Sequence, residues 1–209
     1  VSKKNEHIFK NVREKWEDYL EPKDKIDKEK FEIKKYDFSD LLECCEEWKE
    51  KEAVEGFLCS YQIAIKLLKE YKIPFLSEDE INDFVDGGDK DYLYHGVFIS
   101  AIINELYKSE EFHLNSDKIN YIGCYNEDKK IVVEGDCGYG MGSYMKSGKI
   151  VVEGDCGYYI GINMNGGEIR IYGDNFNPKE QISEYAQKGE IYHKDELVWK
   201  DGELIGEEI

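Results

Sequence analysis

Apolar residues recur at helical spacing through the first half of the chain. A first helix is predicted over residues 8–20, where an apolar side chain stands at every fourth position. It ends before Pro22, because proline disfavours helix in the residue that precedes it. A second helical region begins at residues 37–40, where short polar side chains can cap exposed amides. It runs to Leu68, with a break near residues 50–52.

Two shorter helices are predicted to follow. Ser77 and Glu80 have the spacing of a capping box, in which each side chain bonds the other residue's backbone amide. The helix that they start ends at Gly87–Gly88, and a last helix spans Asp91–Leu106. The acidic stretch 83–91 lacks the alternating ligands and closing glutamate of a calcium loop, so we interpret it as a solvated turn. The residues of the last helix that face inward are Leu93, Val97, Phe98, Ala101, Ile102 and Leu106.

Glycine and β-branched residues dominate the second half. Most of the 19 glycines lie after residue 120, among runs of isoleucine and valine. Such crowding is typical of a chain with many turns between short strands. The change of pattern divides the chain into a helical region, residues 1–115, and a β region, residues 116–209.

The β region contains a tandem repeat with a period of 19 residues. Residues 130–138 return, identical at every position, as residues 149–157, and a third unit opens at Glu168. A unit this short cannot bury its own apolar face, so consecutive units must stack. Partial units flank them, one around Gly123 and one at residues 189–193 after a three-residue insertion. We therefore predict an α+β protein in which the helical region precedes a short right-handed parallel β-helix of about four coils.

Alternate residues of each strand point to opposite sides of the sheet. Ile131 and Val133 therefore share an interior face, on which each stacks on its equivalent in the next coil. Gly135 and Cys137 continue the same alternation. Cys137 and its equivalent Cys156 become neighbours in an interior ladder. We interpret them as packing residues rather than zinc ligands, because no histidine or further cysteine shares their row.

The opposite face carries acidic residues in register from coil to coil. Like charges directly opposed on neighbouring strands are destabilising. Hydrogen bonds from backbone amides to the aspartates would relieve the repulsion, and a ladder of divalent cations is the alternative. The residues concerned are Glu134, Glu153, Asp136, Asp155 and Asp174.

Both ends of such a solenoid expose unpaired strand edges and apolar cross-section. We expect the helical region to cover the first coil. Residues 177–187 and the charged tail after Trp199 are expected to shield the last coil.

The composition narrows the classes of function. The chain of 209 residues has a net charge of −18, from 46 acidic and 28 basic side chains. This charge opposes binding to nucleic acids and anionic membranes, which are themselves polyanions. No apolar stretch reaches the roughly 18–20 residues that span a bilayer, and residues 1–15 lack the apolar core of a signal peptide. We therefore expect a cytoplasmic protein with reduced thiols, in which Cys44 and Cys45 are packing residues.

One stretch of the repeat carries the motif of a known family. The order of glycines, methionine, paired glycines and β-branched residues in Gly157–Ile171, with the closing Gly189–His193, resembles the GXGXG-repeat domain. That domain is found at the C-terminus of the large subunit of glutamate synthase and within formylmethanofuran dehydrogenase. The likeness covers residues 119–200. It implies a scaffolding role, in which chemistry is done by other domains or subunits, and it transfers no catalytic residue to this chain.

We expect a non-catalytic scaffold or protein-interaction module, with a protein partner or self-association. Tyr139, Tyr158 and Tyr159 either supply contact area near the turns of the coils or are simply packed there. By analogy with the family, a structural subunit of an oxidoreductase complex is an alternative.

An enzyme is the other alternative. Its cleft would lie between the helical region and the first coil, near His95, His113 and the pair Glu110–Glu111. The four histidines, which also include His7 and His193, have no metal-ligand spacing. No nucleophile elbow, phosphate loop or dinucleotide fingerprint occurs. The sequence therefore assigns no catalytic, cofactor-binding or metal-binding residue and implies no cofactor.

Overall fold

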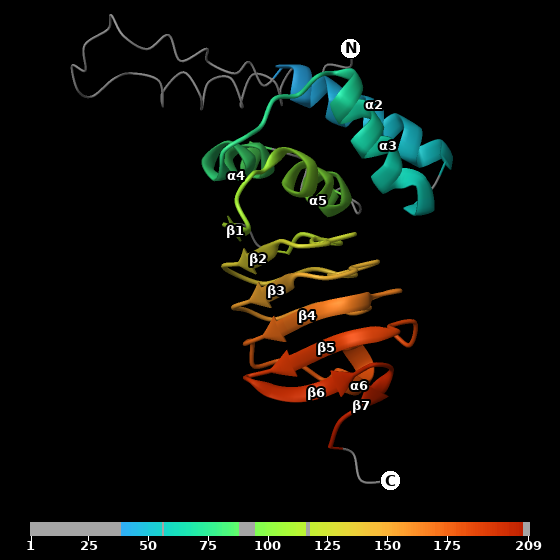
Figure 1. Ribbon diagram of the computed structural model, residues 1–209, viewed down its shortest axis with the longest axis vertical. Coiled ribbons are helices and arrows are strands. Elements are labelled where there is room, and N and C mark those ends of the chain that lie inside the picture. The colour runs from blue at the N-terminus through green and yellow to red at the C-terminus, as the bar shows by residue number, and fades with distance from the viewer. Residues whose placement is uncertain (1–38, 56, 88–94, 116–117, 207–209) are drawn as a thin grey trace, which may run out of the picture.

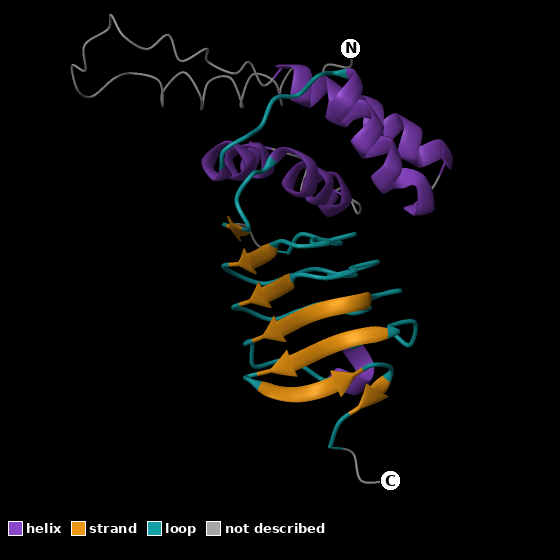
Figure 2. Cartoon of the chain, viewed as in Figure 1, coloured by secondary structure: helices purple, strands orange, loops and turns teal. Residues whose placement is uncertain are grey.

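The computed structural model describes residues 39–55, 57–87, 95–115 and 118–206. In these ranges the helices that precede residue 107 sit at one end of a column of β-coils (Figure 1), whose strands lie on one side of the column (Figure 2). The predicted α+β class is confirmed, with a parallel β-solenoid of about four coils and a period near 19 residues. The helix predicted over residues 8–20 lies outside the described residues.

Helices α2 (Ser39–Glu55) and α3 (Phe57–Glu70) pack against each other at the end of the molecule away from the coils (Figure 1). The Nε1 of Trp48 donates a hydrogen bond to the carbonyl of Ser60, 2.8 Å away. The predicted break near residues 50–52 is wrong, because the glutamates and lysine there are good helix formers and α2 continues through them. The buried stripe of α2 consists of Leu41, Cys44, Cys45 and Trp48, so both cysteines are packing residues as predicted.

The predicted capping box is present at the start of α4 (Glu78–Gly87). The N–H of Glu80 donates to Ser77 Oγ at 3.3 Å, and the N–H of Ser77 donates to Glu80 Oε2 at 2.8 Å. Residues 83–87 of the predicted turn belong to this helix, and the remainder of that turn lies outside the described residues. Helix α5 (His95–Leu106) is almost wholly buried. Its predicted inward-facing residues within the described range are all buried: Val97, Phe98, Ala101, Ile102 and Leu106.

Among the described residues, seven strands form one sheet in chain order. The repeat sets the register, so that Ile131 pairs with Ile150, and Ile150 with Ile169. The sheet begins at residue 111, before the predicted boundary at 116, because Phe112 lies one period before Ile131 and pairs with it. The parallel strands are β1 (Glu111–Leu114), β2 (Lys130–Val133), β3 (Lys149–Val152), β4 (Asn165–Ile171) and β5 (Lys188–His193), and the antiparallel ones are β6 (Glu196–Lys200) and β7 (Glu203–Leu204).

Apolar ladders fill the interior of the solenoid, with successive side chains about 4.8 Å apart. In β2 the predicted interior residues Ile131 and Val133 are buried, and so is Val132 between them. Gly135, which follows the end of β2, is partly exposed rather than interior. Cys137 is again buried and forms a parallel bridge with Cys156, as predicted. One fully buried ladder consists of Phe112, Ile131, Ile150, Ile169 and Ile191.

In each of the first three coils (residues 111–129, 130–148 and 149–167), three of the positive-φ residues stand at alternate positions that are equivalent from coil to coil. This left-handed conformation costs a residue with a side chain about 1–2 kcal/mol, and glycine adopts it freely. Yet the position that Gly140 occupies in the second coil is held by Tyr121 in the first and Tyr159 in the third. The nine residues are Tyr121, Gly123, Tyr125, Gly140, Gly142, Tyr144, Tyr159, Gly161 and Asn163.

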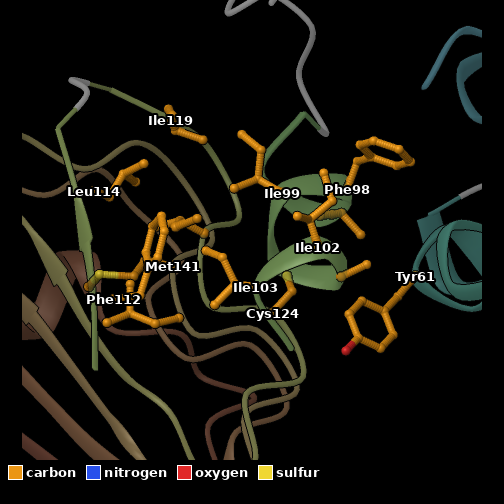
Figure 3. Close-up of a cluster of buried hydrophobic side chains, with 14 of the residues drawn as sticks. Tyr61, Phe98, Ile99, Ile102, Ile103, Phe112, Leu114, Ile119, Cys124 and Met141 are labelled. Atoms are coloured by element: carbon orange, nitrogen blue, oxygen red, sulfur yellow. The ribbon is translucent and has the colours of Figure 1, made fainter. Parts of the chain in front are cut away.

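Helix α5 covers the first coil, as predicted. At Gly96 the two backbones come so close that a Cβ would lie 2.0 Å from the carbonyl oxygen of Asn120. Ser100 Oγ accepts the N–H of Cys124 at 3.2 Å and donates to the carbonyl of Gly96 at 2.6 Å. Apolar side chains from the helix and the coils fill the space between them, among them Ile99, Ile103, Ile119 and Met141 (Figure 3).

The far end is closed differently from the expectation. Residues 177–187, which include α6 (Pro178–Gln181), do not shield the last coil but form a side of it. The N–H of Ile160 in the third coil donates to the carbonyl of Gln181 at 2.9 Å, as one coil bonds to the next. The cover is the β6–β7 hairpin, in which Trp199 is 3% exposed. In the described part of the tail after Trp199, β7 pairs with β6 and belongs to this cover.

Candidate functional site

A cleft of about 260 Å³ lies between the helical part and the first two coils. We call it the helix–solenoid cleft. Tyr61 from α3 and Asn104 from α5 form one side, and Tyr125 and Lys129 from the first coil form the other. The remaining residues that line it are Gln62, Ile65, Glu105, Glu127, Asp128 and Lys146.

Stacked tyrosines form the wall of this cleft. The ring centroids of Tyr61 and Tyr125 are 4.4 Å apart, and those of Tyr125 and Tyr144 are 4.9 Å apart. Asn104 Nδ2 donates a hydrogen bond to the hydroxyl of Tyr61 at 2.8 Å. Burial raises the pKa of Tyr61 far above its ordinary value, so its hydroxyl stays protonated. The tyrosine faces are covered by one another, so the wall offers the edges of the rings, a neutral hydroxyl and an amide group.

Both lysines of the cleft are anchored. Lys129 Nζ donates to the carbonyls of Tyr107 and Ser109, each 2.7 Å away. Lys146 forms an ion pair with Glu127 across neighbouring coils. Because both ammonium groups are bound to other groups of the protein, the two lysines have a structural role at the cleft.

The residues predicted for a catalytic cleft do not line this one. His95 is buried in α5, with its ring centroid 6.1 Å from that of Phe84. His113 lies on β1, where its Nδ1 is 3.0 Å from Glu134 Oε1. Its Nε2 is 3.3 Å from the second carboxylate of the pair Glu110–Glu111. The cleft thus lies in the region that the sequence indicates, but packing of α3 on the first coil brings other residues to it.

Carboxylates surround His113 where α4 meets the sheet. The hydrogen bond with Glu134 raises the pKa of His113, and the charges of Glu78 and Glu111 add to this. Lys130 Nζ donates to Glu111 at 2.6 Å and lowers the pKa of that carboxyl. The backbone N–H of His113 donates to Glu78 Oε2 at 2.8 Å. This cluster ties the helical part to the first coil.

Two of the acidic residues that recur from coil to coil, Asp136 and Asp155, accept hydrogen bonds from amides, as predicted. Asp136 Oδ1 accepts the N–H of Asp155 at 2.9 Å. Asp155 accepts both the N–H and the side-chain amide of Asn175, at 2.9 Å and 2.6 Å, and these bonds lower its pKa. Within the described ranges, no group of three or more histidine, cysteine or acidic side chains is arranged to hold a metal ion. The cation ladder stays a hypothesis that an unchanged melting temperature with added calcium or magnesium would reject.

The stacked cysteines have the properties of packing residues. Burial raises the pKa of Cys137 to about 12 and raises that of Cys156 still further. A thiol reacts as its thiolate, which these pKa values disfavour at neutral pH.

Three tyrosines are exposed on the second and third coils. Tyr139, Tyr158 and Tyr159 are 47%, 46% and 61% exposed, so they are not packed at the turns. The rings of Tyr139 and Tyr158 stack with centroids 6.2 Å apart. We call these three residues the tyrosine patch. Exposed aromatic residues at neighbouring positions are typical of binding surfaces.

Comparison with known proteins identifies no relative. The chain matches no family model, no curated protein and no solved structure. No helix in the part of the chain that the structure describes is long and apolar enough to cross a membrane.

Proposed function

We propose that this chain is a non-catalytic scaffold, a cytoplasmic protein-interaction module built on a β-solenoid. The tyrosine patch is the observation that carries the proposal. Tyrosine buries a large area at little entropic cost and is enriched among the residues that dominate binding energy at interfaces. The coils beneath the patch are locked in register by hydrogen bonds from coil to coil, so the surface is preorganised for a partner. The resemblance to the GXGXG-repeat domain supports the same role.

An affinity capture tests the scaffold function. The tagged full chain, added to lysate of its source cells at moderate salt, is expected to retain a protein partner in a fixed ratio, identified by mass spectrometry. An unrelated acidic protein with the same tag is the control for charge. Retention of the chain alone, after repeated captures and chemical crosslinking, would contradict the proposal.

The identity of the captured protein separates two forms of this function. A redox or amidotransferase subunit in the complex would favour a structural subunit of an oxidoreductase, which the resemblance implies. Any other partner would favour an independent interaction module.

The helix–solenoid cleft supports a second candidate function, the binding of a small polar molecule. Its tyrosine rings and the Asn104 amide combine apolar surface with a few polar groups, which is typical of sites for small molecules. Saturation-transfer NMR with free amino acids as probes would detect such binding. The signal should disappear in the Asn104→Leu variant and persist in a variant of the tyrosine patch.

A further inference from the structure

One residue of the tyrosine patch has an unusual backbone conformation. Tyr159 has a φ of +63°, and the equivalent residue in the coil above is Gly140. Glycine adopts this conformation without cost, whereas a bulky side chain in it is strained. The solenoid therefore folds with no side chain at this position, and Tyr159 is retained there despite a conformational cost.

The other positive-φ tyrosines gain packing that offsets this cost. Tyr125 and Tyr144 stack in the column that begins at Tyr61. The ring of Tyr121 lies over Gly140, where an added Cβ would be 2.2 Å from the ring. Tyr159 differs from these three because 61% of it is exposed, and within the described residues its side chain makes no hydrogen bond or ring contact. Residues with strained backbone cluster at active and ligand-binding sites.

A helix of the fourth coil places a carboxylate at one edge of the patch. Gln181 Nε2 donates to the carbonyl of Cys156, which places α6 against the segment that carries Tyr158. The exposed Glu180 of α6 therefore lies at one edge of the patch, together with the exposed Lys179. The whole chain carries a net charge of −18. A second copy of this chain, a nucleic acid or an anionic membrane would be repelled by this charge.

We propose that the tyrosine patch, Tyr139, Tyr158 and Tyr159, binds an arginine-rich segment of the partner protein. Guanidinium groups stack on tyrosine faces and pair with carboxylates, and they are desolvated at less cost than the ammonium group of lysine. Exposed tyrosine rings with Glu180 at their edge, on a chain with a net charge of −18, fit this chemistry. The inference rests on the scaffold function and specifies which surface is used and what it recognises.

The test measures peptide binding by fluorescence anisotropy. The full chain is titrated into two labelled peptides of equal length and charge, one of arginine and serine and one of lysine and serine. The arginine peptide is expected to bind at least about threefold more tightly. The Tyr159→Gly variant, which restores the residue of the second coil and relieves strain, should keep the fold and weaken arginine-peptide binding about threefold or more. The triple variant that combines Tyr159→Gly with Tyr139→Ala and Tyr158→Ala should bind the arginine peptide at least about tenfold more weakly than the unchanged chain.

A matched control keeps charge and exposure constant. Tyr185 is also 61% exposed but lies in the fourth coil outside the patch, so Tyr185→Ala should bind the peptide like the unchanged chain. Equal binding of the two peptides, or equal binding by the patch variants, would overturn the proposal. A dimer in sedimentation velocity that Tyr159→Gly disperses would overturn it in favour of self-association.

Different results would contradict the assignment of the binding surface and the proposed scaffold function. If the captured cellular partner is retained equally by the patch variants, the scaffold function stands and the assignment of this surface is wrong. If the peptides discriminate as expected but no cellular partner is captured, the surface stands and the scaffold function is wrong.

Discussion

At the residue scale, the coil geometry explains which positions require glycine. The sequence predicts turns from its glycines, but it does not mark Tyr121 or Tyr159 as left-handed residues. The alignment of both with Gly140 is the signal from which this conformation follows. The exposure of the tyrosine patch was not predictable, because a tyrosine beside a turn packs or faces solvent according to neighbours that the period alone does not specify.

Gly148 tests the close approach of neighbouring coils. It has a φ of +81°, and an added Cβ would lie 2.5 Å from the carbonyl oxygen of Lys129. Because backbone atoms cannot move aside, Gly148→Ala should lower the free energy of unfolding by about 2–4 kcal/mol. Gly202 has a φ of +98° and its nearest neighbour atom at 3.9 Å, so Gly202→Ala should cost only about 1 kcal/mol. Urea unfolding measures both, and equal losses would contradict the steric argument.

His113 should make stability depend on pH. Its folded pKa is raised, so protonation favours the folded state, and this contribution is lost as pH rises from the ordinary value of 6.5 through the folded value. Because the side chain is 40% exposed, the effect is expected to stay below about 1 kcal/mol. NMR titration should give a lower imidazole pKa in Glu134→Gln. An unchanged pKa in that variant would contradict the assigned cause.

At the element scale, the elements that could be predicted are those marked by a sequence repeat or by a local capping motif. The strands follow from an explicit repeat, and the capping box of α4 follows from local hydrogen-bond chemistry. The role of residues 177–187 was hidden, because the three-residue insertion places Ile182 beside Ile160 out of the strict period. The residues that line the helix–solenoid cleft were also hidden, since Tyr61 and Tyr125 meet only when α3 packs on the coils.

The contact of α5 with the first coil should be sensitive to one methyl group. Gly96→Ala would place a Cβ 2.0 Å from the carbonyl oxygen of Asn120, so the helix must move away from the coil. We expect a loss of about 1–3 kcal/mol in the free energy of unfolding. Hydrogen exchange of the amides of Tyr121 and Cys124 should accelerate. The exposed α3 substitution Gln62→Ala is the control and should leave exchange in the first coil unchanged.

At the scale of the whole molecule, one continuous core runs from the helices to the hairpin. The helices cover the first coil and the β6–β7 hairpin covers the last, so the described parallel strands have no bare end. The outer face of the sheet adds ion pairs between neighbouring strands, such as Lys149 with Glu168 at 2.7 Å. Exposed pairs of this kind each contribute about 0–1 kcal/mol, so the core dominates stability.

Removal of the buried tryptophan should uncover the far end. Trp199 pairs with Ile191 across β5 and β6. Trp199→Ala should cost about 3–5 kcal/mol and expose strand edge, which promotes association between chains. Sedimentation velocity should detect oligomers that the unchanged chain lacks. Phe75→Ala, at a residue that is 61% exposed, is the control, and oligomers in both variants would contradict the proposed cover.

The identity of residues 130–138 with residues 149–157 gives the molecule an adjustable length. Excision of residues 138–156 would join Cys137 to Gly157 and leave the local sequence at the junction unchanged. The two covered ends would then stand one strand spacing closer, by about 4.8 Å, and Tyr159 would take the place of Gly140 beneath the ring of Tyr121. Duplication of the same segment would move them apart by the same step. The distance between the helical end and the hairpin can therefore change in steps of one coil when a repeat unit is lost or duplicated.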